Sequence, residues 1–216
     1  INAILPVKAF DDNRYIFMAT SLGTVKKTPL SAFSRPRSNG IIAIGLDEGD
    51  YLIGVALTEG NHDVMLFSDG GKAMRFSEND VRPVGRSARG VRGMRLGVGQ
   101  KVISLLVAEN EELTVLTATE NGYGKRTPIS EYTRHNRGTQ GMIAINTSAR
   151  NGKVVAAQLV KQDDEIMLIT TGGILIRTRV SEIREMGRAT QGVTLINLDQ
   201  GEKLVGLERV VEADEE

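Results

Sequence analysis

A segment of about fifty residues repeats four times along this chain, and no other feature restricts the possible folds as strongly. Each copy has an apolar stretch, a glycine, and then a second stretch with a cation four residues after the glycine. Repeats of this length are typical of propeller blades, in which each unit packs only against its neighbours. The shared glycines are Gly23, Gly71, Gly122 and Gly173, at intervals of 48, 51 and 51 residues.

Each copy predicts short strands and no long helix. Apolar runs of four to six residues are interrupted by glycine, aspartate or asparagine, and a glycine at a hairpin turn adopts a positive φ cheaply. An apolar anchor follows ten residues after the glycine, then a second glycine leads into a strand such as 41–44, and a last strand closes the unit. We therefore predict an all-β, propeller-like fold. The closing strands begin at Leu52, Val102, Val154 and Leu204, and the anchors are Phe33, Val81, Tyr132 and Ile183.

The composition excludes several classes of function. Because the chain has no cysteine, it can have neither a disulfide scaffold nor thiol catalysis. No apolar window approaches the length of a membrane span, and the first residues do not resemble a secretory signal. His62 and His135 are far apart in the sequence, which argues against a metal-binding pair and against a catalytic histidine. Gly124 to Thr127 lacks the pattern of a phosphate-binding P-loop. We predict no catalytic residue, no metal ligand and no cofactor in this chain, and the start at Ile1 indicates a piece of a longer protein.

Charge is sorted by repeat position, although the net charge is zero. Residues 23–40, 71–95, 122–141 and 173–192 hold 19 basic and 5 acidic residues, and the rest of the chain holds 8 basic and 22 acidic residues. Solvated lysines and arginines are common on any surface, but a register that recurs in four units favours a continuous positive rim. Arginine forks and exposed glycine amides suit phosphate oxygens, so the expected ligand is the DNA backbone.

Four strings carry a resemblance to a known family. They are NGYGKRTPISEY from Asn121, GTVKKT from Gly23, GVRGMRL from Gly90 and TRVSEI from Thr178. Together with the repeat they resemble the C-terminal domain of bacterial DNA gyrase A, over essentially the whole chain. The resemblance implies a β-pinwheel, a disc of four-stranded blades whose neighbours exchange strands.

The resemblance also implies a function and its residues. The basic rim would bind and wrap duplex DNA without sequence specificity. The domain would serve a type IIA topoisomerase, the ATP-driven enzyme that introduces negative supercoils. The catalytic tyrosine, ATP and Mg²⁺ would belong to other parts of an A2B2 complex with gyrase B, in the bacterial cytoplasm at the nucleoid and not at a membrane. The expected DNA-binding residues are Lys26, Lys27, Arg35, Arg37, Lys72, Arg75, Arg86, Arg89, Arg92, Arg95, Lys125, Arg126, Arg134, Arg137, Arg177, Arg179 and Arg188.

The chain departs from the family pattern at one point. The diagnostic heptad Gln-Arg-Arg-Gly-Gly-Lys-Gly of the first blade is absent, so we expect a β-pinwheel fragment, 1–216, that lacks the first blade or blades and forms an open or partial disc. Residues 1–16 would end a preceding blade, and 211–216 would begin an acidic tail. The alternatives are the C-terminal domain of topoisomerase IV and a protein-interaction propeller. The four repeat units are 17–64, 65–114, 115–166 and 167–210, called repeats 1 to 4 below.

Overall fold

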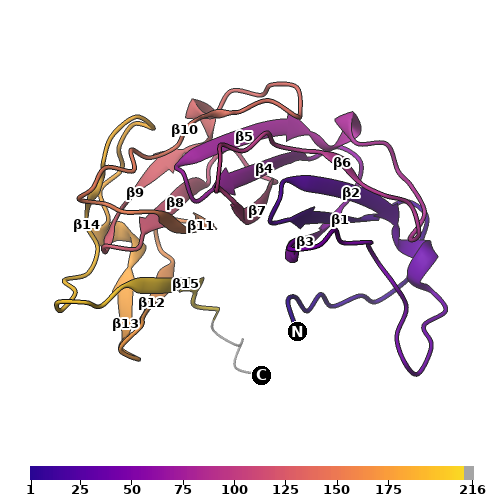
Figure 1. Cartoon of the computed structure of the whole chain (residues 1–216), viewed down its shortest axis with the longest axis horizontal. Helices are drawn as coiled ribbons and strands as arrows, with labels where there is room; N and C mark the ends of the chain where they lie inside the picture. Colours follow the sequence, from indigo (N-terminus) through magenta and orange to yellow (C-terminus); the bar gives the residue numbers. More distant parts are fainter. Residues whose placement is uncertain (212–216) are drawn as a thin grey trace. The chain divides into compact units, whose positions relative to one another are not determined.

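The computed structural model describes residues 1–211, and these residues form short strands and 3-10 turns (Figure 1). They divide into two compact units. Unit 1 comprises residues 1–68, 73–109 and 133–142, and unit 2, as far as residue 211, comprises 69–72, 110–132 and 143–211. The strands lie in four open antiparallel sheets, which confirms the all-β prediction.

Each repeat begins with the predicted hairpin. The shared glycine stands in the turn of each hairpin, with φ between 80° and 88°. A residue with a Cβ is strained at such a φ, so the recurrence of glycine has a local cause. The hairpins are β1 (Tyr15–Thr20) with β2 (Thr24–Pro29), β4 (Asp63–Ser68) with β5 (Lys72–Ser77), β8 (Thr114–Thr119) with β9 (Tyr123–Pro128), and β12 (Glu165–Thr170) with β13 (Leu175–Arg179).

The closing strand of each repeat pairs with the first strand of its hairpin, as the sequence predicted. All four pairs are antiparallel, with a register shift near the end of the first strand. The closing strands are β3 (Leu52–Thr58), β7 (Val102–Ala108), β11 (Val154–Val160) and β15 (Leu204–Arg209).

The fourth strand of a sheet comes from the following repeat. β6 (Val91–Arg92) pairs with β2, β10 (Met142–Ile143) lies beside β5, and β14 (Val193–Thr194) pairs with β9. This exchange confirms the expected β-pinwheel. The sheet of repeat 4 has three strands, in the order β13-β12-β15.

Two segments that were expected to be strands form none. Residues 41–44 are irregular, and so are residues 1–14, where Leu5 and Val7 instead pack against a core cluster that contains Met18. A strand needs a partner to satisfy its backbone groups, and neither segment has one within residues 1–211.

A 3-10 turn follows every hairpin and delivers the apolar anchor to the core. The turns are η1 (Leu30–Phe33), η2 (Glu78–Asp80), η3 (Ile129–Glu131) and η4 (Val180–Glu182). Val81, Tyr132 and Ile183 are buried directly after their turns. Every residue of β4 is buried, so this strand contacts neighbouring layers on both faces.

Two further observations concern the chain as a whole. Within residues 1–211 no helix has the length and apolar character needed to cross a bilayer. The predicted start of an acidic tail, 211–216, lies outside the described residues except for Val211.

Candidate nucleic-acid interface

The cation four residues after each hairpin glycine is held by partners within the fold. Lys27 donates to the carbonyl oxygen of Glu78 at 3.0 Å, and its Nζ lies 3.5 Å from the Glu78 carboxylate. Arg126 donates to the carbonyl of Ile183 and to the Gln162 side chain, both at 2.8 Å. Lys27 and Arg126 are buried. Their recurrent register therefore has a structural origin.

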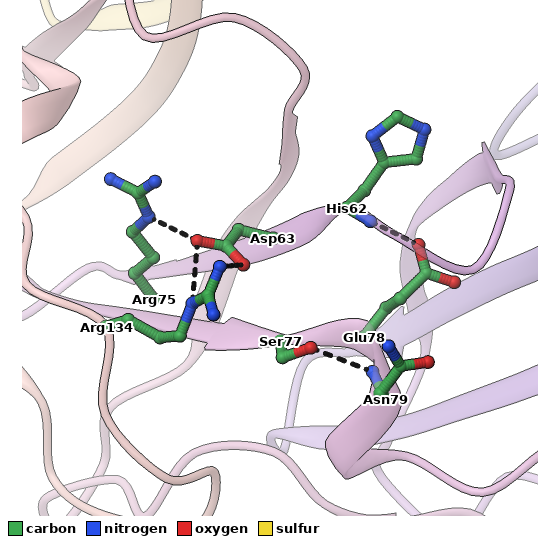
Figure 2. Close-up of polar contacts among 7 residues, drawn as sticks. All are labelled: His62, Asp63, Arg75, Ser77, Glu78, Asn79 and Arg134. Carbon is green, nitrogen blue, oxygen red and sulfur yellow. Dashed lines mark hydrogen bonds and ion pairs between the residues drawn. The ribbon is translucent and has the colours of Figure 1, made fainter.

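The equivalent arginine of repeat 2 shares a buried carboxylate with a second arginine (Figure 2). Asp63, with a side chain only 3% exposed, accepts from Nε of Arg75 at 2.7 Å and from Nε of Arg134 at 3.1 Å. The terminal nitrogen of Arg134 also lies 2.7 Å from Asp63. Removing a buried partner from such a network leaves an uncompensated charge. In repeat 4 the corresponding pair, Arg177 with Glu165, is more exposed.

Glu78 is the second buried carboxylate of this region. Its two oxygens accept the backbone N–H groups of Gly60 and His62 at 3.0 and 2.9 Å, and Figure 2 shows the bond to His62. Lys27 balances the negative charge of this carboxylate, and the two N–H groups satisfy its oxygens. This cluster fixes the loop before β4 to the turn after β5.

Two lysines that the sequence placed on the DNA-binding rim are buried among carbonyl oxygens. Lys125 donates to the carbonyls of Gly187 at 2.7 Å and Thr190 at 3.1 Å, and it also contacts the carbonyl of Arg188. Burial lowers the pKa of Lys125 to about 8. Lys26 donates to the carbonyl of Ala43 at 2.9 Å and to that of Arg86, and burial lowers its pKa as well. Both lysines hold loops near the hairpin, and each binds a loop of the following repeat.

Four of the predicted DNA-binding residues are buried, and their contacts support a structural role instead. Lys26, Lys27, Lys125 and Arg126 have at most 5% of their surface exposed, and their polar atoms bind groups of the protein. A phosphate at the surface cannot replace these partners without opening the core. These residues position loops and do not form the proposed contact surface.

Three arginines at one repeat position join consecutive repeats, and we call them the staple arginines: Arg86, Arg137 and Arg188. Each donates from Nε to a carbonyl in the 3-10 turn of the preceding repeat and from Nη1 to a second carbonyl of that repeat. The Nε acceptors are Ala32 at 3.0 Å, Asp80 at 2.9 Å and Glu131 at 2.6 Å. The Nη1 acceptors are Ile42 at 3.0 Å, Arg92 at 3.0 Å and Ile143 at 2.8 Å. These two bonds give each staple arginine a structural role, whatever else it binds.

Of the remaining predicted cations, Arg75 is largely buried beside Asp63 and Lys72 is half-buried. The others are exposed, including Arg134, although it is paired with Asp63. The expected DNA-binding residues did not include Arg82, Arg150 and Arg184, which are also exposed. Arg150 lies outside the basic segments, but its guanidinium stacks 4.3 Å from the Tyr123 ring centroid, and no sequence pattern indicated this contact. The exposed predicted cations are Arg35, Arg37, Arg89, Arg92, Arg95, Arg134, Arg177 and Arg179.

Unit 1 gathers most of these arginines on loops that are bonded to each other. The loop 82–95 and the loop 133–139 are joined by Gly138 N–H to the Gly93 carbonyl at 2.7 Å and by Arg95 N–H to the Thr139 carbonyl at 2.9 Å. Open hollows place Arg37 beside Arg86, and Arg82 beside Arg89. We call the exposed set the arginine face of unit 1: Arg35, Arg37, Arg82, Arg89, Arg92, Arg95 and Arg134.

The described residues contain no cluster of three or more histidine or acidic side chains that could hold a metal ion. The arginine face offers guanidinium donors and positive charge, although Arg89 is paired with Asp47 at 3.2 Å and Arg134 with Asp63 at 2.7 Å. Such a surface can bind the oxygens of a phosphate backbone, because guanidinium groups match phosphate in both charge and geometry.

The sequence matches the profile of the family described as DNA gyrase C-terminal domain, beta-propeller, over residues 14–59, 62–109, 114–161 and 164–210. DNA gyrase A of Pseudomonas aeruginosa is 60% identical over 198 residues, which are 92% of this chain and 21% of the relative. DNA gyrase A of Escherichia coli is 54% identical over 217 residues, covering all of this chain and 25% of the relative. The chain thus spans about a quarter of the length of these relatives.

Two solved structures have the same fold. The structure described as DNA gyrase A C-terminal domain superposes with a TM-score of 0.84 and 28% identity, covering 95% of this chain and 68% of the other. The C-terminal domain of DNA topoisomerase IV superposes with a TM-score of 0.89 and 25% identity, covering 95% of this chain and 64% of the other.

Proposed function

This chain belongs to the family of DNA gyrase C-terminal domains, and we propose on that premise that it binds and wraps duplex DNA as a module of gyrase. The proposed contact surface is the arginine face of unit 1. In unit 2 the exposed Arg150, Arg179 and Arg184 are further candidates. Binding would be to the phosphate backbone, without base-specific readout.

The observation that carries this proposal is the loop 82–95. It has five arginines and no acidic residue, and Arg82, Arg89, Arg92 and Arg95 are exposed. Lys26 and the staple bonds of Arg86 hold the backbone of this loop in place, which lowers the entropy cost of ordering the loop when DNA binds. Each phosphate neutralised by such a group releases counterions, which provides affinity that depends on salt.

We also propose the wider setting of this module. Strand breakage by a catalytic tyrosine would lie elsewhere in gyrase A, and ATP hydrolysis with Mg²⁺ would lie in gyrase B, in an A2B2 complex in the bacterial cytoplasm. This chain would bend and wrap the DNA and would contribute no catalytic group. The support is its similarity to part of gyrase A in several bacteria.

The corresponding domain of topoisomerase IV is the second candidate, because that fold superposes with a TM-score of 0.89. The sequence favours gyrase, since gyrase A proteins of two bacteria are 50% and 60% identical to this chain. A protein-interaction propeller is the third candidate. It predicts binding to an acidic protein and no affinity for DNA.

Fluorescence anisotropy with a duplex of about 40 base pairs across a salt series tests the DNA-binding proposal. The surface variant changes Arg89, Arg92 and Arg95 to Gln, and the matched control changes Lys101, Lys153 and Lys161 to Gln. Both remove three exposed positive charges. In the surface variant only, we expect the slope of log affinity against log salt to fall by about 0.9 for each phosphate no longer bound. Equal slopes for wild type and surface variant would contradict the proposed interface.

A further inference from the structure

Three asparagines of the chain are followed directly by glycine: Asn39, Asn121 and Asn151. Asparagine is a thermolabile residue. A following glycine has no Cβ, so its backbone nitrogen can approach the asparagine side chain without steric hindrance. In an unfolded chain the three asparagines should therefore react at similar rates. The folded structure, however, gives their side chains very different surroundings.

The backbone is nearly the same at Asn39 and Asn121. Each is the third residue of a four-residue turn, which the following glycine closes by donating its N–H to the carbonyl of the first residue. The N–O distance is 2.9 Å from Gly40 and 3.0 Å from Gly122. The two glycines have φ values of 80° and 87°. A difference in reactivity between these two asparagines must therefore come from their side chains and not from the turn.

The side chains of Asn121 and Asn151 are held by hydrogen bonds. The amide nitrogen of Asn121 donates to the Arg150 carbonyl at 3.0 Å, and its oxygen accepts from Nζ of Lys203. Asn151 is fully buried, and its amide nitrogen donates to two backbone carbonyls, each at 2.7 Å. Neither side chain can rotate toward the following backbone nitrogen until these bonds break.

Asn39 is exposed, and its side chain has no hydrogen-bond partner within residues 1–211. It is the residue before the second glycine of its repeat, and none of its counterparts is buried. Arg89 and Gln140 are exposed, and Gln191 is half-buried. A paired strand follows shortly after each of these three residues. The exposure of this position therefore does not depend on whether the next segment has a strand partner.

Positive charge lies close to Asn39. Arg37 is the first residue of the same turn, and both residues line an open hollow together with Arg86. Attack of the Gly40 nitrogen on the asparagine side chain produces a negatively charged intermediate, which neighbouring guanidinium groups stabilise. Because the hollow is open, water also reaches this site.

We propose that Asn39 is the site at which the folded chain deamidates fastest, and that the product weakens DNA binding. The backbone nitrogen of Gly40 forms a bond to Cγ of Asn39, the bond from Cγ to Nδ2 breaks, and ammonia leaves with the proton of the Gly40 N–H. Water then opens the succinimide ring at one of its two carbonyl carbons. The product is aspartate or isoaspartate, and the reaction needs no oxidant, reductant or enzyme.

The product carries a negative charge where the amide was neutral. This charge lies on the arginine face of unit 1, two residues after Arg37. A carboxylate there pairs with an arginine or repels a phosphate, and either effect lowers the affinity for DNA. This second part rests on the proposed function, whereas the deamidation itself does not.

Peptide mass spectrometry after incubation of the folded chain at mildly alkaline pH measures the three rates. We expect Asn39 to deamidate at least about tenfold faster than Asn121 and Asn151, because two or more hydrogen bonds must break before either of those reacts. In urea, where the chain is unfolded, the three rates should be similar. Comparable rates in the folded chain would overturn the proposal, and so would a difference of the same size in urea.

Anisotropy with the same duplex tests the effect on DNA binding. Asn39→Asp reproduces the charge of the product, and Asn13→Asp adds the same charge at an exposed asparagine outside the basic segments. We expect Asn39→Asp to weaken DNA binding about threefold at low salt and less at high salt, and Asn13→Asp to weaken it less. Equal affinities of the two variants would overturn the second part. A wild-type chain without affinity for DNA would overturn the second part together with the proposed function, and the deamidation rates would still decide the first part.

Discussion

Unit 1 and unit 2 are each built around two of the hairpins but present different surfaces. Unit 1 holds 15 basic and 10 acidic residues, and unit 2, as far as residue 211, holds 12 basic and 13 acidic residues. The loop 82–95 of unit 1 has no acidic residue, whereas the corresponding loop of unit 2 has Glu185 between Arg184 and Arg188. The cations at repeat positions that both units share, such as Arg126 and the staple arginines, are the ones that form hydrogen bonds within the fold.

The positive residues of the two units are of two kinds, those that recur at one repeat position and those that do not. A positive residue that recurs at one repeat position is held by a carboxylate, a ring or a carbonyl of the same unit, as Arg75 is by Asp63. A positive residue that one loop has and its counterpart lacks, such as Arg89 or Arg92, is exposed. Recurrence therefore indicates a structural role in this protein, and the variable arginines are the better candidates for DNA contact.

The largest effect should come from breaking the buried pair of unit 1. Asp63→Ala leaves Arg75 without its carboxylate, so we expect the free energy of unfolding to fall by about 3 kcal/mol. Glu165→Ala makes the same change at the equivalent position of unit 2, where the carboxylate is 29% exposed, and should cost at most about 1 kcal/mol. Urea unfolding measures both. Equal losses would show that burial does not distinguish the two pairs.

Lys125 should make stability depend on pH. Its pKa is about 8 in the folded chain against 10.5 for an ordinary lysine, so between these values the unfolded state binds more protons. The free energy of unfolding should therefore rise with pH from about 8 to 10.5, by up to about 1.4 kcal/mol per pH unit. Lys125→Met should reduce this rise relative to wild type in unfolding curves at several pH values. Identical pH profiles for the two proteins would exclude Lys125 as the cause.

A smaller effect should follow from removing one staple. Arg188→Ala loses two hydrogen bonds to carbonyl groups in unit 2, and we expect a cost of about 2 kcal/mol. Arg184→Ala removes an exposed arginine of the same loop and should change the free energy of unfolding by less than about 0.5 kcal/mol. Thermal unfolding of the two variants compares the loss of an arginine that is bonded within the fold with the loss of an arginine at the surface. If Arg184→Ala were the more harmful change, the assignment of the staple would be wrong.

The smallest effect should come from making unit 2 more like unit 1. Glu182→Gln with Glu185→Gln removes two exposed acidic groups beside the arginines of this unit, and we expect DNA affinity to rise about threefold at low salt and less at high salt. Glu208→Gln removes an exposed acidic group outside the basic segments and serves as the control. A rise in the control of the same size would show that net charge alone sets the affinity.

Much of the fold was predictable because its signals are local. The hairpin glycines, the closing strands and the apolar anchors repeat at fixed spacing, and a turn glycine with positive φ is a requirement of a few neighbouring residues. Strand exchange between repeats was expected only through the resemblance to a family. The missing strand at 41–44 was not foreseen, because a segment with strand composition still needs an acceptor.

The sequence by itself determined the repeat, the hairpins and the concentration of positive charge in four segments. The tertiary structure decided which of those charges reach the surface. Lys26 and Lys125 are the clearest case, since their acceptors lie up to 60 and 65 residues away, in the next repeat. Both faces of the strands are covered by neighbouring layers, so a lysine on such a strand is desolvated and must bind carbonyl oxygens. Long-range packing of this kind is not visible in a local pattern of residues.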